Sequence, residues 1–511
     1  MSRRSRNLAF IGLALTACGQ PEALVTVELS LPSKEQLDPY RFSDRLVSVR
    51  VSVDGPDRFD DVSKDLALTD RKAEFEAFPA ERAVTIVVEG LDRLGNLIAY
   101  GRVENLQVDD DVSVQVPFRR LLAYVVHRPV CGGGCGDGRA CVDVLDGYAC
   151  QPVLTPEECV DSEGAALSCG DQTACVTYRG GPSCRSKFDR VSKGTEVVYV
   201  IDLLTRALVD RVQIPGEGPR ALGISPRGGE GVMVTYTAGG KGFVGLLKSA
   251  DHEWETLELD SIQDLALLGP GQNIGMAAGG GQISVFDWSK KDVVKTDPAG
   301  GRVLDGKLGY GGRRAIFVIN KEPGVILVQP DIPTNQNISI AVAGAAGVAV
   351  DEKGELAYVT SSVEQTVTGV DLARAGNSVR LNGGVAATCG AAAFSAAMQS
   401  ILCIEAGTNP RPRVHAYSVA TSSGWKLETA VGTLPDPSGI AAAPGGARLV
   451  VVSAGTTTTS SGLTMIDTDI EVGPDGSTIS YPTDPDDTFV RGSSTIHQRY
   501  QASRVAVLYG R

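Results

Sequence analysis

Hydrophobic and polar positions alternate through much of residues 21–126. Valine, leucine, alanine and phenylalanine occupy every second position in several short runs, a period that is typical of strands with one buried and one solvated face. Turn-forming sequences at 54–56 and 94–96 separate some of the runs. About seven strands within roughly 100 residues predict a two-sheet sandwich. The runs are 25–31, 47–53, 73–77, 84–88 and 112–118.

A different pattern extends from about residue 194 to the end of the sequence. An apolar stretch, a glycine or proline turn and a valine-rich strand recur at an interval of roughly 40–48 residues, and such a period with several short strands per unit predicts a β-propeller. Corresponding apolar positions in successive units are Leu222, Leu265, Leu308, Val348, Ala392 and Ile440.

The number of blades depends on the two ends of this region. Six full units are visible, and residues 196–213 supply only the last two strands of another unit. A strand-like run at 499–509 ends the sequence. If that run pairs with the strands of 196–213, it completes a blade and removes two open sheet edges. The sequence therefore predicts seven blades, with six as the alternative.

Several strands of these units end in an apolar residue followed by aspartate. The shared position at a strand end favours a role in capping hairpin turns over a catalytic role. Together with the turns that precede valine-rich strands, these segments resemble the bacterial YVTN-type or NHL-like propellers over roughly 60% of the chain, by analogy of repeat architecture. The aspartates are Asp202, Asp287, Asp371 and Asp467.

The beginning of the sequence has the layout of a secretory signal: basic residues, a short apolar run at 8–17 and small residues before Cys18. The run is about 10 residues, shorter than the ~20 that span a bilayer. The segment Leu15-Thr16-Ala17-Cys18 resembles the lipobox of bacterial lipoproteins, which implies cleavage before Cys18 and lipid attachment to its sulfur and its new amine. The alternative is an ordinary signal peptide with a chance cysteine.

Ten further cysteines follow, an even number, and eight of them form an internal repeat between residues 131 and 184. Such density is normal where disulfides form, and each copy is too small to fold without covalent links. The spacing Cys-x5-Cys-x8-Cys recurs in both copies. The first copy contains Cys131, Cys135, Cys141 and Cys150, and the second contains Cys159, Cys169, Cys175 and Cys184.

Each copy resembles the first half of an EGF-like module, although the fifth and sixth cysteines of that family are missing. The resemblance implies the pairings Cys131–Cys141, Cys135–Cys150, Cys159–Cys175 and Cys169–Cys184. Four cysteines in themselves allow three connectivities. Zinc is disfavoured because export favours oxidation, no Cys-x2-Cys pair is present and His127 is the only nearby histidine.

Cys389 and Cys403 lie on either side of a turn at 396–397 in the fifth unit of the propeller. In a regular hairpin they would face each other across two strands, where Cβ atoms approach within ~5 Å. A cross-strand disulfide is therefore expected, with two unbonded buried cysteines as the alternative.

Catalytic and metal-binding motifs are absent from the sequence. The four histidines form no metal-binding pair, and glycine-rich segments at 239–242 and 279–281 are better explained as hairpin turns. Acidic segments at 109–111 and 484–487 lack EF-hand spacing and are interpreted as solvated turns. The net charge of −13 and the lack of a basic cluster beyond the signal argue against binding of nucleic acid.

These observations predict an all-β protein in four segments: a lipoprotein signal peptide (1–17), a sandwich similar to immunoglobulin-like or transthyretin-like modules (18–126), two four-cysteine repeats (127–188) and a propeller (189–511). We expect no cofactor and no metal. The expected protein is held to a membrane of the bacterial envelope by Cys18, the outer membrane being favoured and its periplasmic or external face left open. The sandwich and a cysteine-rich stalk would then present the propeller to a protein, peptide or glycan partner. An enzyme acting at the central channel, either a lactonase-like hydrolase or a cofactor-dependent enzyme, is the alternative.

Overall fold

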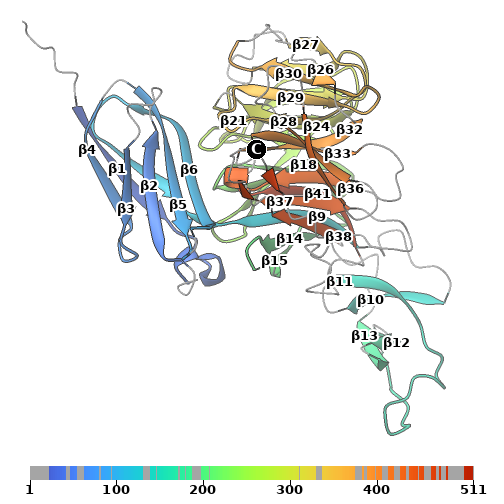
Figure 1. Cartoon of the computed structure of the whole chain (residues 1–511). Helices are drawn as coiled ribbons and strands as arrows, with labels where there is room; N and C mark the ends of the chain where they lie inside the picture. Colours follow the sequence, from blue (N-terminus) through green and yellow to red (C-terminus); the bar gives the residue numbers. More distant parts are fainter. Residues whose placement is uncertain are drawn as a thin grey trace, which may run out of the picture.

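Strands dominate the structure, as the alternating sequence predicts (Figure 1). Helical segments in the described part of the chain are the short 3₁₀ turns η1 (Glu35–Leu37), η2 (Pro39–Arg41) and η4 (Pro444–Gly446). No helix among the described residues is long and apolar enough to cross a membrane. The computed structural model describes residues 22–41, 46–54, 62–79, 82–93, 95–129, 138–144, 147–170, 173–178, 180–186, 197–205, 208–309, 311–329, 337–374, 383–384, 388–396, 399–405, 413–418, 426–432, 437–446, 448–453, 462–467, 471–472, 479–480 and 500–509.

The N-terminal part is a sandwich of two sheets whose inner faces share one hydrophobic core. Val25 and Val27 of one sheet and Val49 and Val51 of the other are fully buried, because alternate side chains of a strand point to the same face. One sheet has the order β4-β1-β7, with β1 and β7 parallel, and the other has the order β3-β2-β5-β6-β8. The strands are β1 (Glu22–Ser30), β2 (Ser48–Asp54), β3 (Val62–Leu66), β4 (Lys72–Pro79), β5 (Arg82–Leu91), β6 (Leu97–Val108), β7 (Val112–Pro117) and β8 (Arg119–Arg120).

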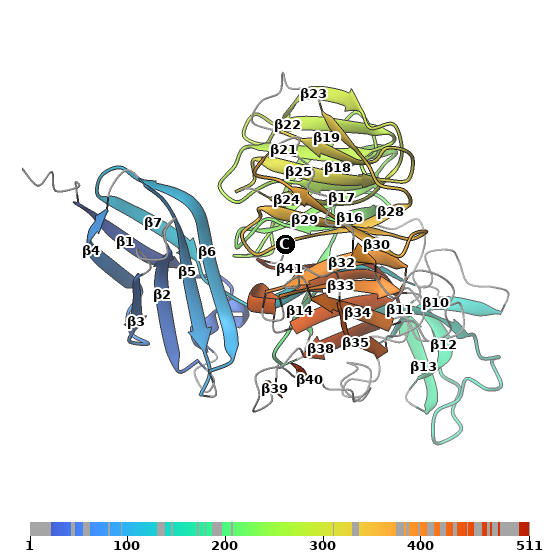
Figure 2. The ribbon, with the colours of Figure 1, turned by 45° about the horizontal axis from the view of Figure 1, so that its top comes forward.

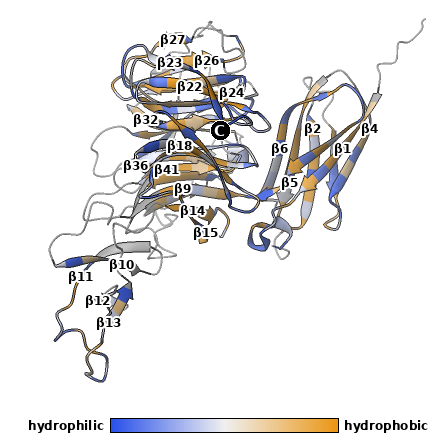
Figure 3. Ribbon diagram, turned by 180° about the vertical axis from the view of Figure 1, so that it is seen from behind, coloured by the Kyte–Doolittle hydropathy of each residue, from blue (hydrophilic) through white to orange (hydrophobic). Residues whose placement is uncertain are grey.

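The C-terminal part is a β-propeller in which antiparallel sheets follow one another along the chain (Figure 2). Hydrophobic residues are present in the strands of both parts (Figure 3). The sheets in chain order are β16 (Arg220–Pro226) to β19 (Trp254–Leu259), β20 (Leu265–Leu267) to β23 (Asp292–Pro298), β24 (Val303–Gly309) to β27 (Ile338–Ala341), β28 (Ala345–Val350) to β31 (Gly383–Gly384), β32 (Cys389–Ser395) to β35 (Lys426–Gly432), and β36 (Pro437–Ala442) to β38 (Gly462–Asp467).

The other strands of each sheet lie successively further from the inner strand that begins it. They are β17 (Gly231–Ala238), β18 (Lys241–Lys248), β21 (Ile274–Gly279), β22 (Gln282–Asp287), β25 (Arg314–Ile319), β26 (Gly324–Val328), β29 (Leu356–Ser361), β30 (Thr366–Asp371), β33 (Ser400–Glu405), β34 (Arg413–Ser418) and β37 (Arg448–Ser453). A separate pair is formed by β39 (Glu471–Val472) and β40 (Ile479–Ser480).

A further sheet of the ring combines distant parts of the sequence. Its order is β15 (Leu208–Gln213), β14 (Val197–Asp202), β9 (Leu122–Pro129) and β41 (Tyr500–Val507). The C-terminal strand joins the strands of 196–213 in one sheet, as expected, but β9 lies between β41 and β14. The expected boundary at residue 126 therefore differs from the structure, because it divides a propeller strand.

Inner strands of neighbouring sheets contact one another around the whole ring. The contacts run from β16 through β20, β24, β28, β32 and β36 to β41, which in turn contacts β16. This closed order leaves no inner strand at an open edge. The described sheets therefore surround a common axis, which is the central channel of the propeller.

The cysteine-rich repeats occupy a different place from the expected one. They are inserted between β9 and β14, two neighbouring strands of one propeller sheet, and consist of the hairpins β10 (Arg139–Val144) with β11 (Gly147–Pro152) and β12 (Thr173–Tyr178) with β13 (Gly181–Ser186). In all three views they lie on the far side of the propeller from the sandwich (Figures 1, 2 and 3). The expectation of a stalk between sandwich and propeller is therefore wrong. Only Leu121 separates β8 of the sandwich from β9 of the propeller.

Candidate functional site

The central channel contains a hollow of about 230 Å³ at the end where the inner strands begin. Its wall is formed by residues of all the inner strands, and most of these residues are small or aliphatic. No histidine or aromatic side chain is present among the described residues of this wall. The lining consists of Gly223, Ile224, Asp264, Leu265, Val303, Leu304, Asp305, Lys307, Ala346, Ala391, Ala392, Ser438, Gly439, Ile440, Arg504 and Val505.

Small residues line the channel because the inner strands approach one another closely. A β-bulge interrupts most of these strands, for example between Ala221 and Gly223 and between Ala345 and Gly347. A Cβ atom on Gly223 would lie 2.1 Å from the carbonyl oxygen of Asp264, far inside van der Waals contact. Glycine is therefore required where one inner strand packs against the backbone of the next.

Charged residues occupy the corresponding position directly after the bulge in two other strands. Asp305 follows the bulge of β24, and Arg504 follows the bulge of β41. The Asp305 carboxylate accepts hydrogen bonds from the backbone N–H groups of Gly306, at 2.8 Å, and Val348, at 3.1 Å. Asp305 therefore joins β24 to the neighbouring β28, and its charge is already satisfied by backbone donors.

Arg504 reaches across the channel. Its Nη1 atom donates to the carbonyl oxygen of Leu304 at 3.4 Å, although β41 and β24 belong to sheets that are not neighbours in the ring. The side chain is half-buried, and its one hydrogen bond among the described residues uses one of the five N–H groups of a guanidinium. Most of its donors therefore remain available at the hollow.

Asp264 is the second carboxylate of the hollow and lies directly before β20. Partial burial raises the pKa of Asp264, against the opposing effect of the Arg302 and Arg504 guanidinium groups. The same aspartate also lines a shallower hollow beside the channel, together with Arg302, Asn320 and Lys321. The channel mouth and this rim thus form one continuous surface, which we call the open face.

The opposite end of the channel is covered by the sandwich. Tyr100 and Arg102 of β6 lie against the ends of the inner strands, where only a cavity of about 40 Å³ remains. Tyr509, just after β41, packs edge-on against Tyr100 with ring centroids 5.2 Å apart and donates a hydrogen bond to the carbonyl of Pro117. We call this end the covered face.

Buried polar contacts hold the covered face together. Arg120 donates to the Asp202 carboxylate from Nε at 2.9 Å and from Nη2 at 2.5 Å, and both side chains are less than 10% exposed. Arg119 donates to the Ser249 hydroxyl at 2.9 Å. These contacts join the strands at the sandwich–propeller junction to two propeller turns, so the covered face is a built interface.

A buried histidine adds a hydrogen-bond network to this interface. The Nδ1 atom of His252 lies 2.6 Å from Asp210, which also accepts from Lys34 at 3.1 Å, and its Nε2 atom lies 3.3 Å from the Tyr124 hydroxyl. Burial lowers the pKa of His252 despite the nearby Asp210 carboxylate. The geometry fits a neutral ring that donates through Nδ1 and accepts from Tyr124.

The aspartates at strand ends cap turns, as the sequence analysis expected. Asp202 accepts from the backbone of Leu204 and Thr205, and Asp287 accepts from the backbone and hydroxyl of Ser289. Asp371 accepts from the two N–H groups of residues 373 and 374, both at 2.9 Å. The side chain of Asp467 lies outside the described residues.

Two disulfides join the second cysteine repeat: Cys159–Cys175 and Cys169–Cys184. This is the connectivity that the EGF-like resemblance implies. For the first repeat, only the backbone pairing of Cys141 with Cys150 is described, and the expected bonds of Cys131, Cys135, Cys141 and Cys150 lie outside the described side chains. Cys18 also lies outside the described residues.

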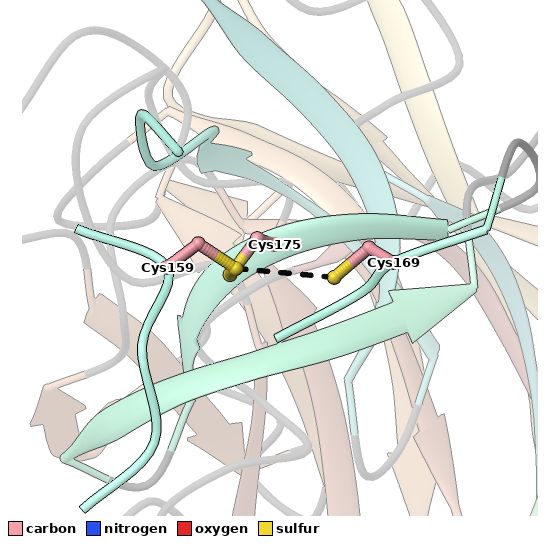
Figure 4. A group of neighbouring side chains, drawn as sticks. All are labelled: Cys159, Cys169 and Cys175. Atoms are coloured by element: carbon pink, nitrogen blue, oxygen red, sulfur yellow. Dashed lines mark hydrogen bonds between the residues drawn. A yellow bond between two sulfur atoms is a disulfide. The ribbon is translucent and has the colours of Figure 1, made fainter. Parts of the chain in front are cut away.

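The sulfur atoms of Cys159, Cys169 and Cys175 lie within 4.8 Å of one another, a distance that would also suit a metal ion (Figure 4). The separation of Cys159 and Cys169 is 4.0 Å. All three sulfurs belong to the two adjacent disulfides, and a metal needs thiolates. The cluster is therefore explained by cross-linking of one small repeat.

Cys389 and Cys403 form the third described disulfide, with Cα atoms 5.5 Å apart. They are not direct partners in the hairpin: Cys403 pairs with Ala392, and a bulge separates Cys389 from that pair. The expected disulfide is present. The expectation that the two cysteines lie directly opposite each other in a regular hairpin is therefore wrong. The bulge at Gly390 and Ala391 accommodates the offset between the bonded cysteines.

The remaining candidates behave as structural residues where they are described. The carboxylate of Asp111, in the acidic turn at 109–111, accepts from the N–H of Leu24 at 2.8 Å. His415 is buried beside Glu405, with Nε2 3.4 Å from its carboxylate. The side chains of His127 and His497, and residues 484–487, lie outside the described part of the chain.

Comparisons with known proteins add little to these observations. No protein-family model matches the chain, and no curated protein matches it. Among solved structures, a putative 6-phosphogluconolactonase from Bacteroides uniformis has 11% identity and a TM-score of 0.43, covering 57% of this chain and 92% of that one. Kuenenia stuttgartiensis hydrazine synthase has 15% identity and a TM-score of 0.40 (48% and 76%), and the mitotic checkpoint complex has 13% and 0.41 (50% and 78%). These likenesses carry no argument about function, and the propeller assignment rests on the sheet order described above.

Proposed function

We propose that this protein is a lipid-anchored propeller of the bacterial cell envelope that binds a protein, peptide or glycan partner at its open face. One observation carries the proposal: the two ends of the same channel are unlike. The covered face is filled by the sandwich, whereas the open face retains a hollow with charged side chains. Hollows with a few convergent polar groups are the usual places for ligands.

The anchor is proposed from the sequence around Cys18. Labelling of cells that express the full chain with a palmitate analogue should mark the protein, and Cys18→Ser should abolish the mark. A matched control is Cys389→Ser, which removes a cysteine of the propeller and should leave the label unchanged. Label that persists in Cys18→Ser would overturn the lipoprotein assignment. Membrane fractionation of the labelled protein tests the outer-membrane location.

The anchor gives the proposed arrangement a direction. Cys18 precedes β1, and β1 belongs to the sheet of the sandwich that lies away from the propeller (Figures 1 and 2). The sandwich therefore stands nearest the membrane. Because the sandwich occupies the covered face, the open face points away from it and is accessible to partners.

The binding function is tested with the detergent-solubilised full chain. It should retain partners on peptide and glycan arrays, and a block of the open face should remove them. An Ala391→Trp substitution places a large side chain in the wall of the hollow without touching the covered face. Val62→Trp, on the exposed edge strand β3 of the sandwich, is the control and should leave binding unchanged. Absence of any array signal would overturn the proposal.

A channel enzyme is the alternative function, and one observation favours it. Asp264 is a carboxylate with a raised pKa beside two arginines, a setting that suits proton transfer. Lactone hydrolysis that is abolished in Asp264→Asn would support this reading. Unchanged hydrolysis in Asp264→Asn would show that Asp264 does not transfer a proton in this reaction.

A further inference from the structure

Basic side chains gather on the open face although the protein as a whole is acidic. Lys307 and Arg504 line the channel hollow, and Arg302 and Lys321 line the adjoining rim. The side chains of Arg302, Lys307 and Lys321 form no hydrogen bond or ion pair with other described residues. Lys307 is half-buried, whereas Arg302 and Lys321 are exposed on the rim. A cation without a bonded partner beside a hollow is a ready donor for an anionic ligand.

The two acidic groups of the hollow do not cancel this charge. Asp305 is held by two backbone N–H groups and does not face an arginine or lysine across an ion pair. Asp264 lies under the influence of Arg302 and Arg504 together. Four cations and two carboxylates therefore leave an excess of positive charge along a surface that runs from the rim into the channel.

The net charge of −13 does not prevent binding of an anion there. At physiological ionic strength the Debye length is ~8 Å, so acidic groups elsewhere on the surface are largely screened. Partly buried groups that line the hollow are screened less. The local excess of positive charge therefore decides which ligand is attracted.

The size and chemistry of the hollow favour an inserted side chain over a sugar. The channel hollow, at about 230 Å³, is below the ~300–1,000 Å³ of pockets that enclose whole small molecules, whereas the open rim hollow beside it, at about 740 Å³, has room for the rest of an extended ligand. Flat aromatic faces, on which sugar rings commonly stack, are missing from its described wall. Aliphatic residues such as Leu265 and Ile440 instead suit the methylene groups of a glutamate.

We infer that the open face binds an extended acidic peptide segment of a partner protein, with one glutamate or aspartate inserted between Lys307 and Arg504 and further acidic residues over Arg302 and Lys321. This inference rests on the proposed binding function and names its ligand. Arg504 binds the inserted carboxylate with donors that its bond to Leu304 leaves unused, and Lys307 supplies the second cation.

The test uses the full chain in detergent and fluorescence anisotropy with a labelled peptide that contains four glutamates in a glycine–serine background. The matched peptide carries four glutamines, and oligogalacturonate tests whether any carboxylated polymer suffices. The acidic peptide should bind, its affinity should fall with added salt, and the glutamine peptide should bind at least tenfold more weakly.

Substitutions locate the binding. Lys307→Gln should weaken binding of the acidic peptide about tenfold, as should Arg504→Gln, whereas Asp264→Asn should strengthen it severalfold by removing a competing carboxylate. Lys290→Gln is the matched control, because Lys290 is exposed at a turn of the covered face and should leave the affinity unchanged. If Arg504→Gln does not fold, Lys307→Gln and Asp264→Asn decide the question.

The outcomes separate this inference from the proposed function. Equal binding of the two peptides, preference for oligogalacturonate, or unchanged affinity in Lys307→Gln would overturn the acidic-peptide inference. The binding function would still stand if array ligands were lost in Ala391→Trp. No ligand in either experiment would overturn both.

Discussion

The two ends of the propeller channel use charged side chains in opposite ways. On the covered face, Arg120 and Asp202 are almost completely buried and bonded to each other. On the open face, Lys307 and Arg504 are half-buried, and their donors are mostly unused within the described structure. The same inner strands connect both ends, so the difference arises from what packs against each end.

The comparison teaches how burial assigns roles to similar residues. A charge that is taken out of water requires a partner, and removal of that partner leaves an uncompensated buried ion. A charge at a solvated hollow has no such requirement and can exchange water for a ligand. Stability should therefore depend on charges of the covered face, and binding on charges of the open face.

The strongest test of this division is Arg120→Met. It leaves the Asp202 carboxylate buried without its partner and should lower the free energy of unfolding by about 3–5 kcal/mol, measured by chemical denaturation. Lys241→Met, which breaks the exposed pair with Glu258, should cost less than ~1 kcal/mol. Equal losses in the two variants would contradict the contrast between buried and exposed pairs.

Tyr509→Phe should have a smaller effect on the same face. The substitution keeps the ring against Tyr100 but leaves the carbonyl of Pro117 without its donor. We expect a loss of about 1–3 kcal/mol in the free energy of unfolding, the usual cost of an unsatisfied buried group. An unchanged denaturation midpoint would show that this hydrogen bond does not stabilise the interface.

His252 predicts a pH dependence of stability. Its pKa is lowered in the folded chain, so the unfolded chain binds the proton first and stability should fall as the pH decreases below the ordinary value of 6.5. The slope for one proton is at most ~1.4 kcal/mol per pH unit. Burial would raise the pKa of Asp210, but hydrogen bonds from His252 and Lys34 lower it in the folded chain. Protonation of Asp210 therefore reduces stability only below its ordinary pKa of 3.8, outside the range in which His252 acts.

The measurement compares denaturation midpoints between pH 4.5 and 7 for the natural chain and His252→Asn. Asparagine suits the backbone at this position, where φ is 59°. The variant should be less stable at pH 7 but should have a flatter pH profile. A profile as steep as that of the natural chain would exclude His252 as its source.

The smallest effect on stability is expected on the open face. Lys307→Gln and Asp264→Asn should change the free energy of unfolding by no more than about 0.5 kcal/mol, because each residue is half-exposed and forms no bonded ion pair among the described residues. A loss comparable with that of Arg120→Met would show that these residues serve the fold instead of a ligand.

The sequence was most informative where burial follows a local rule. Val25, Val27, Val49 and Val51 alternate with polar neighbours, and all four are buried as predicted. It failed at β9, where Leu122 to Val126 are buried on both faces and form a continuous apolar run. Such a run shows that a strand is buried but not which sheet contains it, and its place in the sequence next to the sandwich strands predicts the wrong sheet.

The charged residues of the channel could not be found in the same way. Asp305 and Arg504 occupy equivalent places after β-bulges, yet no residue spacing reveals a bulge before the strands are paired. The recurring position Leu308 lies three residues beyond Asp305, so the apolar repeat is out of register with the bulge in this strand. The signal that the sequence offers is a charged residue among small ones near the start of a repeat, as at Asp305 and Arg504.

The sequence by itself determined that this protein is all-β, that its C-terminal part is built from repeats, and that Cys159, Cys169, Cys175 and Cys184 belong to a cross-linked unit. These properties depend on residues close together in the chain. Tertiary structure alone decided that β9 lies between β14 and β41 in one sheet, that the cysteine repeats project from the propeller, and that Lys307 and Arg504 meet at one hollow. The physical reason is that these features depend on contacts between segments far apart in the sequence, which local patterns of burial do not encode.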